Sequence, residues 1–184
     1  TSSDGGFTWS APIAPVLFPT HDPADWDRDL VADPVVLYVG GTYYMFYEGG
    51  GGDPLSIAIG LATSSDGITW TRSGDAPVLT PGAPGEWDET WALDPMVIED
   101  AGQWQMWFRG MNSLNERAIG YATSSDGLAW TKYGSNPVLA ADPLSWDTGG
   151  PAGPWVDYFE GTYSMWYASN RQIGYATSTD GITW

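Results

Sequence analysis

The sequence contains no cysteine, so neither disulfides nor thiolate metal sites hold this fold together. No apolar run approaches the roughly 18 residues that a membrane-spanning segment requires. No window keeps the apolar period that a helix longer than one or two turns would show. These absences exclude a disulfide scaffold and a fold built mainly from helices.

Basic residues are scarce, with 6 Lys and Arg against 23 Asp and Glu, for a formal net charge of −17. A surface this acidic repels polyanions, so we exclude nucleic acid and membranes as partners. The charge suits neutral ligands such as sugars, or cations, or a saline habitat, and the composition leaves these explanations open.

Aromatic residues, glycine and proline are abundant: the 184 residues include 12 Trp, 10 Tyr, 24 Gly and 14 Pro. Strands favour aromatic side chains, whereas tight turns favour Gly and Pro. The composition therefore predicts many short strands joined by turns, which is an all-β fold.

One motif occurs four times, which shows that the chain is built from internal repeats. Its copies are TSSDGGFTW (1–9), TSSDGITW (63–70), TSSDGLAW (123–130) and TSTDGITW (177–184), and their last Trp residues are 61, 60 and 54 residues apart. Three shorter markers keep the same spacing: PVL from Pro15, Pro77 and Pro137; Trp-Asp from Trp26, Trp87 and Trp146; and Ile-Gly from Ile59, Ile119 and Ile173. Such a period means that one supersecondary unit is repeated.

Each unit is predicted to contain four antiparallel strands. The first begin at Asp33, Asp94 and Gly153, the second span 42–48, 103–109 and 162–168, the third contain Ile-Gly, and the fourth run from the Trp of the SDG motif towards PVL. The run from Tyr43 to Tyr47 is apolar at consecutive positions, which is typical of strands covered on both faces. Blades of a β-propeller are sandwiched in this way, so the sequence predicts a propeller of three four-stranded blades.

The repeats divide this single propeller region, 1–184, into an orphan outer strand at 1–18, blade one at 19–79, blade two at 80–139 and an incomplete blade three at 140–184. Three blades do not close a compact ring. Either the chain is part of a five-bladed ring, or two copies form a homodimer that closes a six-bladed ring. The sequence begins with Thr1 instead of Met, which favours the first alternative. We favour a secreted or cell-surface location.

The order of the strands predicts which loops lie together. Because the chain reverses at every strand, the Trp-Asp loops, the starts of the first strands and the loops between second and third strands share one face, and the SDG turns share the other. In these turns Asp66 and Asp126 are expected to accept hydrogen bonds from turn amides, with Gly67 and Gly127 at positive φ. The aspartates of the Trp-Asp pairs are expected to brace the crossover loops.

Units of the form WD…DP…YYMFY…IGYATSSDGITW…PVL resemble, over the whole chain, the repeats of five-bladed β-propeller glycosidases. The similar families are the arabinanases and xylosidases, the invertases and levansucrases, the mannoside phosphorylases and uncharacterised glycosidase-like relatives. The resemblance is specific for the blade. It implies a carbohydrate-active protein that acts on or binds a neutral oligosaccharide in a central funnel; the alternative is a non-catalytic glycan-binding or structural propeller.

The resemblance also implies that acids at the starts of the first strands point into the funnel. Asp33 matches the general base or nucleophile of these families, and Asp94 matches the acid that binds substrate or tunes the proton donor. Cleavage needs a further carboxylic acid that protonates the leaving oxygen. The third unit has Ala152 in its place, so enzyme activity is left open. An Asp before Pro can also simply cap a turn.

Six further residues are candidates for contacting a sugar: Trp26, Trp87, Glu89, Trp91, Arg109 and Trp146. Tryptophan rings can stack on a pyranose, and packing between blades is their competing role. Arg109 could bind an anionic group or pair with a neighbouring acid. No metal and no cofactor are expected. Asp25, Asp27 and Asp29 alternate as in a calcium loop but lack its glycine and distal glutamate, so calcium is a secondary hypothesis.

Overall fold

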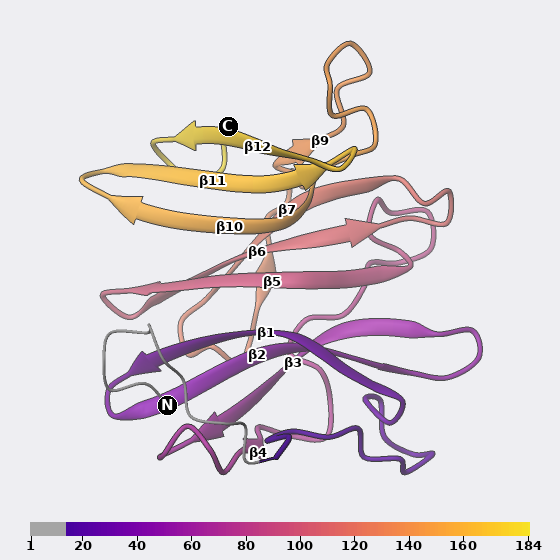
Figure 1. Cartoon of the computed structure of the whole chain (residues 1–184), viewed down its shortest axis with the longest axis vertical. Helices are drawn as coiled ribbons and strands as arrows, with labels where there is room; N and C mark the ends of the chain where they lie inside the picture. The colour runs from indigo at the N-terminus through magenta and orange to yellow at the C-terminus, as the bar shows by residue number, and fades with distance from the viewer. Residues whose placement is uncertain (1–13) are drawn as a thin grey trace.

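The computed structural model describes residues 14–184, and all regular elements in this range are β-strands. Figure 1 shows three antiparallel meanders stacked along the longest axis, from the indigo first unit to the yellow third unit. Their long strands are β1 (Leu30–Val39), β2 (Thr42–Gly51) and β3 (Ser56–Ser64); β5 (Trp91–Asp100), β6 (Gln103–Met111) and β7 (Arg117–Ser124); and β10 (Ala152–Phe159), β11 (Thr162–Ser169) and β12 (Gln172–Ser178). The predicted all-β fold is confirmed. Residues 14–184 contain no helix long and apolar enough to span a membrane.

The predicted fourth strands are shorter than expected. In the first two units, β4 (Thr71–Arg72) and β8 (Thr131–Lys132) each cover two residues, and β9 (Leu139–Ala140) adds a second short pairing. Pro77 and Pro137 are the first residues of the PVL motifs, and proline has no N–H to donate to a ladder. Within the described chain, the third unit consists of β10, β11 and β12.

The first strands of the three units are neighbours, since β5 contacts β1 on one side and β10 on the other. A single parallel pair, Ile57 with Trp91, joins the first two units into one nine-stranded sheet, and the third unit forms a separate sheet. The sheets of residues 14–184 do not close on one another. A closed propeller and its number of blades therefore remain predictions.

Two hydrophobic cores lie between successive units. Phe46 of the first unit packs with Met106 and Phe108 of the second, and Trp107 of the second packs with Val156 of the third. Successive residues of a strand point to opposite faces, so β2 and β6 each contribute to two hydrophobic clusters, one on each face. This explains the consecutive apolar residues of β2 and β6, whose predicted burial on both faces is confirmed.

The outer face of the third unit is open, and Trp155, Trp166 and Tyr175 are exposed on it. The homodimer that would cover this face remains a prediction. Of the predicted outer strand at 1–18, only residues from 14 onwards are described, and the first SDG copy lies outside the described residues. The proposed boundaries of the units likewise remain predictions.

The SDG turns have the predicted geometry. Asp66 Oδ1 accepts hydrogen bonds from the amides of Thr69 (2.7 Å) and Ile68 (2.8 Å), and Gly67 has a φ of +72°. These bonds lower the pKa of Asp66 to about 2, and equivalent bonds lower the pKa of Asp126 and of Asp180. The aspartates therefore stabilise turns, as expected.

Candidate active site

The first strands begin slightly before the predicted positions, at Leu30, Trp91 and Ala152, and each contains near its start a residue whose backbone lies in the left-handed region. The φ angle is +44° at Asp33, +48° at Asp94 and +56° at Gly153. In each unit the pairing with the second strand shifts register at this same place. Positive φ is uncommon outside glycine, and such strained residues cluster at functional sites. The fold thus gives Asp33 and Asp94 one special geometry.

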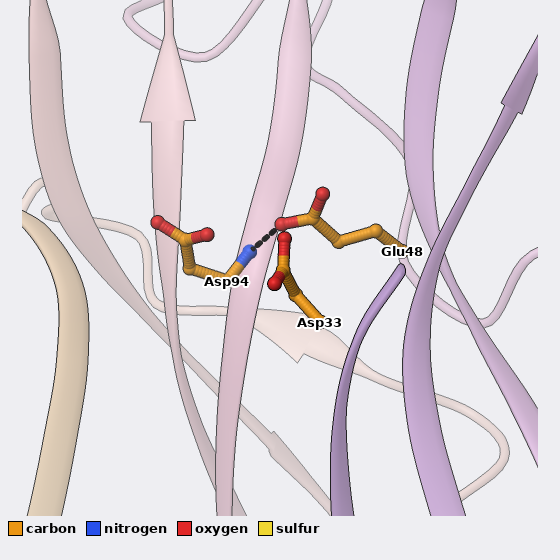
Figure 2. Close-up of side chains that lie close together, drawn as sticks. All are labelled: Asp33, Glu48 and Asp94. Atoms are coloured by element: carbon orange, nitrogen blue, oxygen red, sulfur yellow. Dashed lines mark hydrogen bonds between the residues drawn. The ribbon is translucent and has the colours of Figure 1, made fainter. Parts of the chain in front are cut away.

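Asp33, Glu48 and Asp94 form a carboxyl cluster, with one oxygen of each within 4.8 Å of the others (Figure 2). Asp33 lies on β1 and Glu48 on β2 of the first unit, and Asp94 lies on β5 of the second. Asp33 is exposed, Asp94 is half-buried, and Glu48 is only 4% exposed. The structure therefore brings the two predicted acids together and adds a third.

Sequence analysis missed Glu48, although the repeat contains a signal that points to it. Glu48 is the one charged residue of β2, directly after the apolar run. The strand register places it opposite Ala32, whereas Arg109 stands opposite Leu93 at the same position of the second unit. A charge at the end of a buried strand is costly unless it is paired or used. Comparing the second strands would have identified this position.

Glu48 is in an environment that favours its neutral form. Burial raises its pKa to about 8, and the negative charges of Asp94 and Asp33 act in the same direction. Its Oε1 accepts a hydrogen bond of 2.6 Å from the backbone N–H of Asp94, which opposes the rise. Glu48 therefore carries a proton at neutral pH.

The Asp94 side chain has two partners. Its Oδ2 accepts a hydrogen bond from the backbone N–H of Gly153 (2.9 Å) and lies 3.0 Å from Nε of Arg109. The angle at Arg109 Nε lies outside the range of a hydrogen bond, so this contact is an ion pair only. Arg109, a candidate for binding an anionic group, thus pairs with a neighbouring acid, which was the alternative. Three carboxyl groups could also hold a divalent cation, but a protonated Glu48 and the Arg109 charge oppose one.

The three Trp-Asp tryptophans pack against their own units. Each ring packs against an aromatic residue of the second strand in its own unit. The distances between ring centroids are 5.9 Å for Trp26 and Tyr47, 5.6 Å for Trp87 and Phe108, and 5.8 Å for Trp146 and Tyr167. Each ring also covers the glycine of an Ile-Gly pair: a methyl group at Gly60 would come within 2.8 Å of Trp26. This contact explains why Ile-Gly and Trp-Asp recur together. Stacking of these rings on a sugar remains a prediction.

The aspartates of the Trp-Asp pairs are buried and brace the crossover loops, as expected. Asp27 accepts hydrogen bonds from Arg72 Nε (2.7 Å) and the Tyr47 hydroxyl (2.9 Å), and Asp88 pairs with Lys132. The Asp27 carboxylate is therefore already occupied in the loop considered for calcium, and calcium binding there remains only a prediction.

Glu89 and Trp91 connect loops on the face that carries the carboxyl cluster. Glu89 accepts hydrogen bonds from the amides of Gly85 (2.5 Å) and Ser113 (3.0 Å), and Trp91 donates to the Leu55 carbonyl (3.2 Å). The bond from Ser113 joins a crossover loop to the β6–β7 loop, and the bond from Trp91 joins the start of β5 to the β2–β3 loop, in agreement with their predicted shared face. Contact of either residue with a sugar remains a prediction.

Comparison with known proteins finds relatives but no matching family model. An uncharacterized protein of Mycobacterium tuberculosis is 32% identical over 154 residues, which cover 81% of this chain and 48% of the relative. A type blood N-acetyl-α-D-galactosamine deacetylase of Flavonifractor plautii is 27% identical over 138 residues, which cover 68% of this chain and 17% of that protein. The chain thus spans about half the length of the mycobacterial relative.

Solved structures identify the fold. A family 117 glycoside hydrolase from the marine bacterium Zobellia galactanivorans superposes with a TM-score of 0.71 at 20% identity, over 88% of this chain and 47% of the hydrolase. The described strands share the fold of part of that hydrolase. A structure from the GH130 family, described as containing hydrolases of β-1,2-mannosidic linkages in Candida mannan, has a TM-score of 0.66 at 23% identity, over 86% of this chain and 49% of that one.

Proposed function

We propose that the chain is part of a carbohydrate-active protein of the glycosidase type. In this proposal the three units are successive blades of a β-propeller, and the carboxyl cluster faces a funnel that receives a neutral oligosaccharide. The fold shared with glycoside hydrolases supports the ligand class. The observation that carries the proposal is the carboxyl cluster, in which a protonated Glu48 lies beside an exposed Asp33.

Cleavage of a glycosidic bond needs one carboxyl group that protonates the leaving oxygen and one carboxylate that attacks carbon or activates water. Glu48 is our candidate acid, and Asp33 is our candidate nucleophile or base. Asp94 orients Glu48 through its amide. Glu48 would then act as the proton donor, in place of the acid that the similar families carry where this chain has Ala152.

The spacing within the carboxyl cluster favours attack by Asp33 itself. Retaining glycosidases keep their two carboxyl groups roughly 5–5.5 Å apart, whereas inverting enzymes leave roughly 6.5–9.5 Å for a water molecule. One carboxyl oxygen of Asp33 lies within 4.8 Å of one carboxyl oxygen of Glu48. We therefore propose the retaining route, in which the Asp33 carboxylate attacks the anomeric carbon and Glu48 protonates the leaving alcohol.

The test is a turnover assay on neutral oligosaccharides, including the β-1,2-mannosides and N-acetyl-α-galactosaminides for which similar proteins are named. Asp33→Asn should lower kcat at least about 100-fold. Glu48→Gln should also lower kcat, and it should remove the loss of wild-type activity above about pH 8. Glu160→Gln, at an exposed position, is the matched control. Wild-type turnover that survives Asp33→Asn would contradict the proposal.

Glycan binding without catalysis is the second candidate function. It is favoured by Ala152 at the position of the expected acid and by the deep burial of Glu48. It predicts saturable sugar binding without product from any substrate, and detection of product would remove it. A homodimer that closes a six-bladed ring belongs to this candidate, and light scattering would then give twice the mass of the chain.

A further inference from the structure

A cavity of about 640 Å³ lies between the second and third units, away from the carboxyl cluster. Its walls come from the β6–β7 loop, from the segment 137–143 and from the crossover residues 148–150, and the ring of Trp87 lines it. None of Asp33, Glu48 or Asp94 lines it. Its volume falls in the range of roughly 300–1,000 Å³ that is usual for small-molecule sites.

Hydrogen bonds hold these walls in place. Asn112 Oδ1 accepts from the amides of Leu114 and Glu116, both at 3.0 Å, and its Nδ2 donates to the Glu116 carboxylate (2.8 Å). On the opposite wall, Asn170 Nδ2 donates to the Trp146 carbonyl (2.7 Å) and to Thr148 Oγ1 (3.1 Å). The cavity is therefore a formed feature of two braced loops.

Arg117 lines the cavity without an acidic partner. The ion pairs of residues 14–184 engage the other basic residues except Arg171, and no carboxylate of this range lies within 4.0 Å of the Arg117 guanidinium. The adjacent Glu116 also lines the cavity, and its carboxylate accepts a hydrogen bond from Asn112. A guanidinium that has no partner in a chain of net charge −17 is free to pair with a ligand, and its planar donors match a carboxylate.

We infer that this cavity binds a carboxylate-bearing sugar residue, with the carboxylate on Arg117 and the sugar ring beside Trp87. Arg109, which pairs with Asp94, precedes Asn112 by three residues, or about 10 Å of extended chain. One oligosaccharide could therefore reach from the carboxyl cluster to the cavity. The inference takes from the proposed function only that the ligand is a carbohydrate. It differs in giving that carbohydrate a carboxylate, and binding here requires no catalysis.

The test compares the binding of galacturonic acid trimer with that of its methyl ester by titration calorimetry. The acid should bind, the ester should bind at least about tenfold more weakly, and Arg117→Gln should weaken binding of the acid at least about tenfold. Arg171→Gln, which changes the charge equally outside the cavity, should change the Kd less than about twofold.

The inference would be overturned if the acid did not bind, if the ester bound equally well, if Arg117→Gln left binding unchanged, or if inorganic phosphate competed as well as the acid does. Asp33→Asn separates this site from the carboxyl cluster, since it should abolish turnover but leave acid binding at the cavity within about twofold. Loss of acid binding in Asp33→Asn would assign the ligand to the carboxyl cluster and would also overturn the inference.

Discussion

In the first and second units the left-handed residue at the start of the first strand is an aspartate, and in the third it is Gly153. The backbone is the same in all three, with a register shift at one place. On the second strand the matching position changes from Glu48 to Arg109 and then to Ala168. The repeat therefore supplies one backbone position with positive φ in each unit, and the side chain at that position decides whether the unit can provide a functional group.

Burial differs between the units as well. Trp107 is fully buried between the second and third units, whereas Trp166, at the same position of β11, is 39% exposed. Equivalent positions of the repeat therefore contribute differently to stability. Among residues 14–184, only the first two units have a following unit packed against them. The predictions below test this contrast, beginning with the largest effect.

Trp107→Ala should lower the free energy of unfolding by about 3–5 kcal/mol, because it opens a cavity in a core and removes the hydrogen bond from Nε1 to the Gly181 carbonyl. Trp166→Ala should cost less than about 1 kcal/mol. Urea denaturation followed by circular dichroism measures both. Similar losses for the two variants would mean that a further element covers the third unit in solution.

Asp27→Ala should lower the free energy of unfolding by about 3 kcal/mol, because it leaves Arg72 and the Tyr47 hydroxyl without their buried partner. Asp147→Ala in the third unit should cost about 1 kcal/mol, since Asp147 is bonded to the Tyr167 hydroxyl instead of a cation. The same denaturation assay compares them. A larger loss for Asp147 would reverse the contrast.

Glu48→Gln should change the dependence of stability on pH. The pKa of Glu48 rises from 4.5 to about 8 on folding, so the wild type loses stability as the pH rises through this window. At about pH 9 the Gln variant should be more stable than the wild type by on the order of 1–3 kcal/mol, and near pH 4 the two should be equal. Glu160→Gln is again the control. A flat difference between pH 4 and 9 would refute a protonated Glu48.

Replacing the turn aspartates by asparagine should have the smallest effect, and it should be alike in all three units. Hydrogen bonds lower the pKa of Asp66, Asp126 and Asp180, so their contribution is present at neutral pH and is lost as the pH falls through the lowered values. Each variant should melt slightly below the wild type at pH 7, and the difference should be smaller at about pH 2. Thermal scans at both pH values test this, and unequal shifts would show that the turns are not equivalent.

Much of the fold was readable from the repeat, because turn and packing motifs act locally. The SDG turns, the burial of both faces of β2 and the brace at Asp27 follow from residues close in sequence or from their regular spacing. The fourth strands were overestimated, since a continuous strand from the Trp of the SDG motif towards PVL was predicted and only two residues pair in β4 and in β8. Asp33 and Asp94 were found because they repeat, and Glu48 was missed because its position carries a different residue in each unit.

The sequence by itself determined the repeat, the all-β class and the acids at the starts of two first strands, since periodicity and turn chemistry are written along the chain. Only the tertiary structure decided that Asp33, Glu48 and Asp94 meet across two units, that burial keeps Glu48 neutral, and that Arg117 faces a cavity. These features depend on distances and desolvation between segments far apart in the chain, which no local pattern specifies.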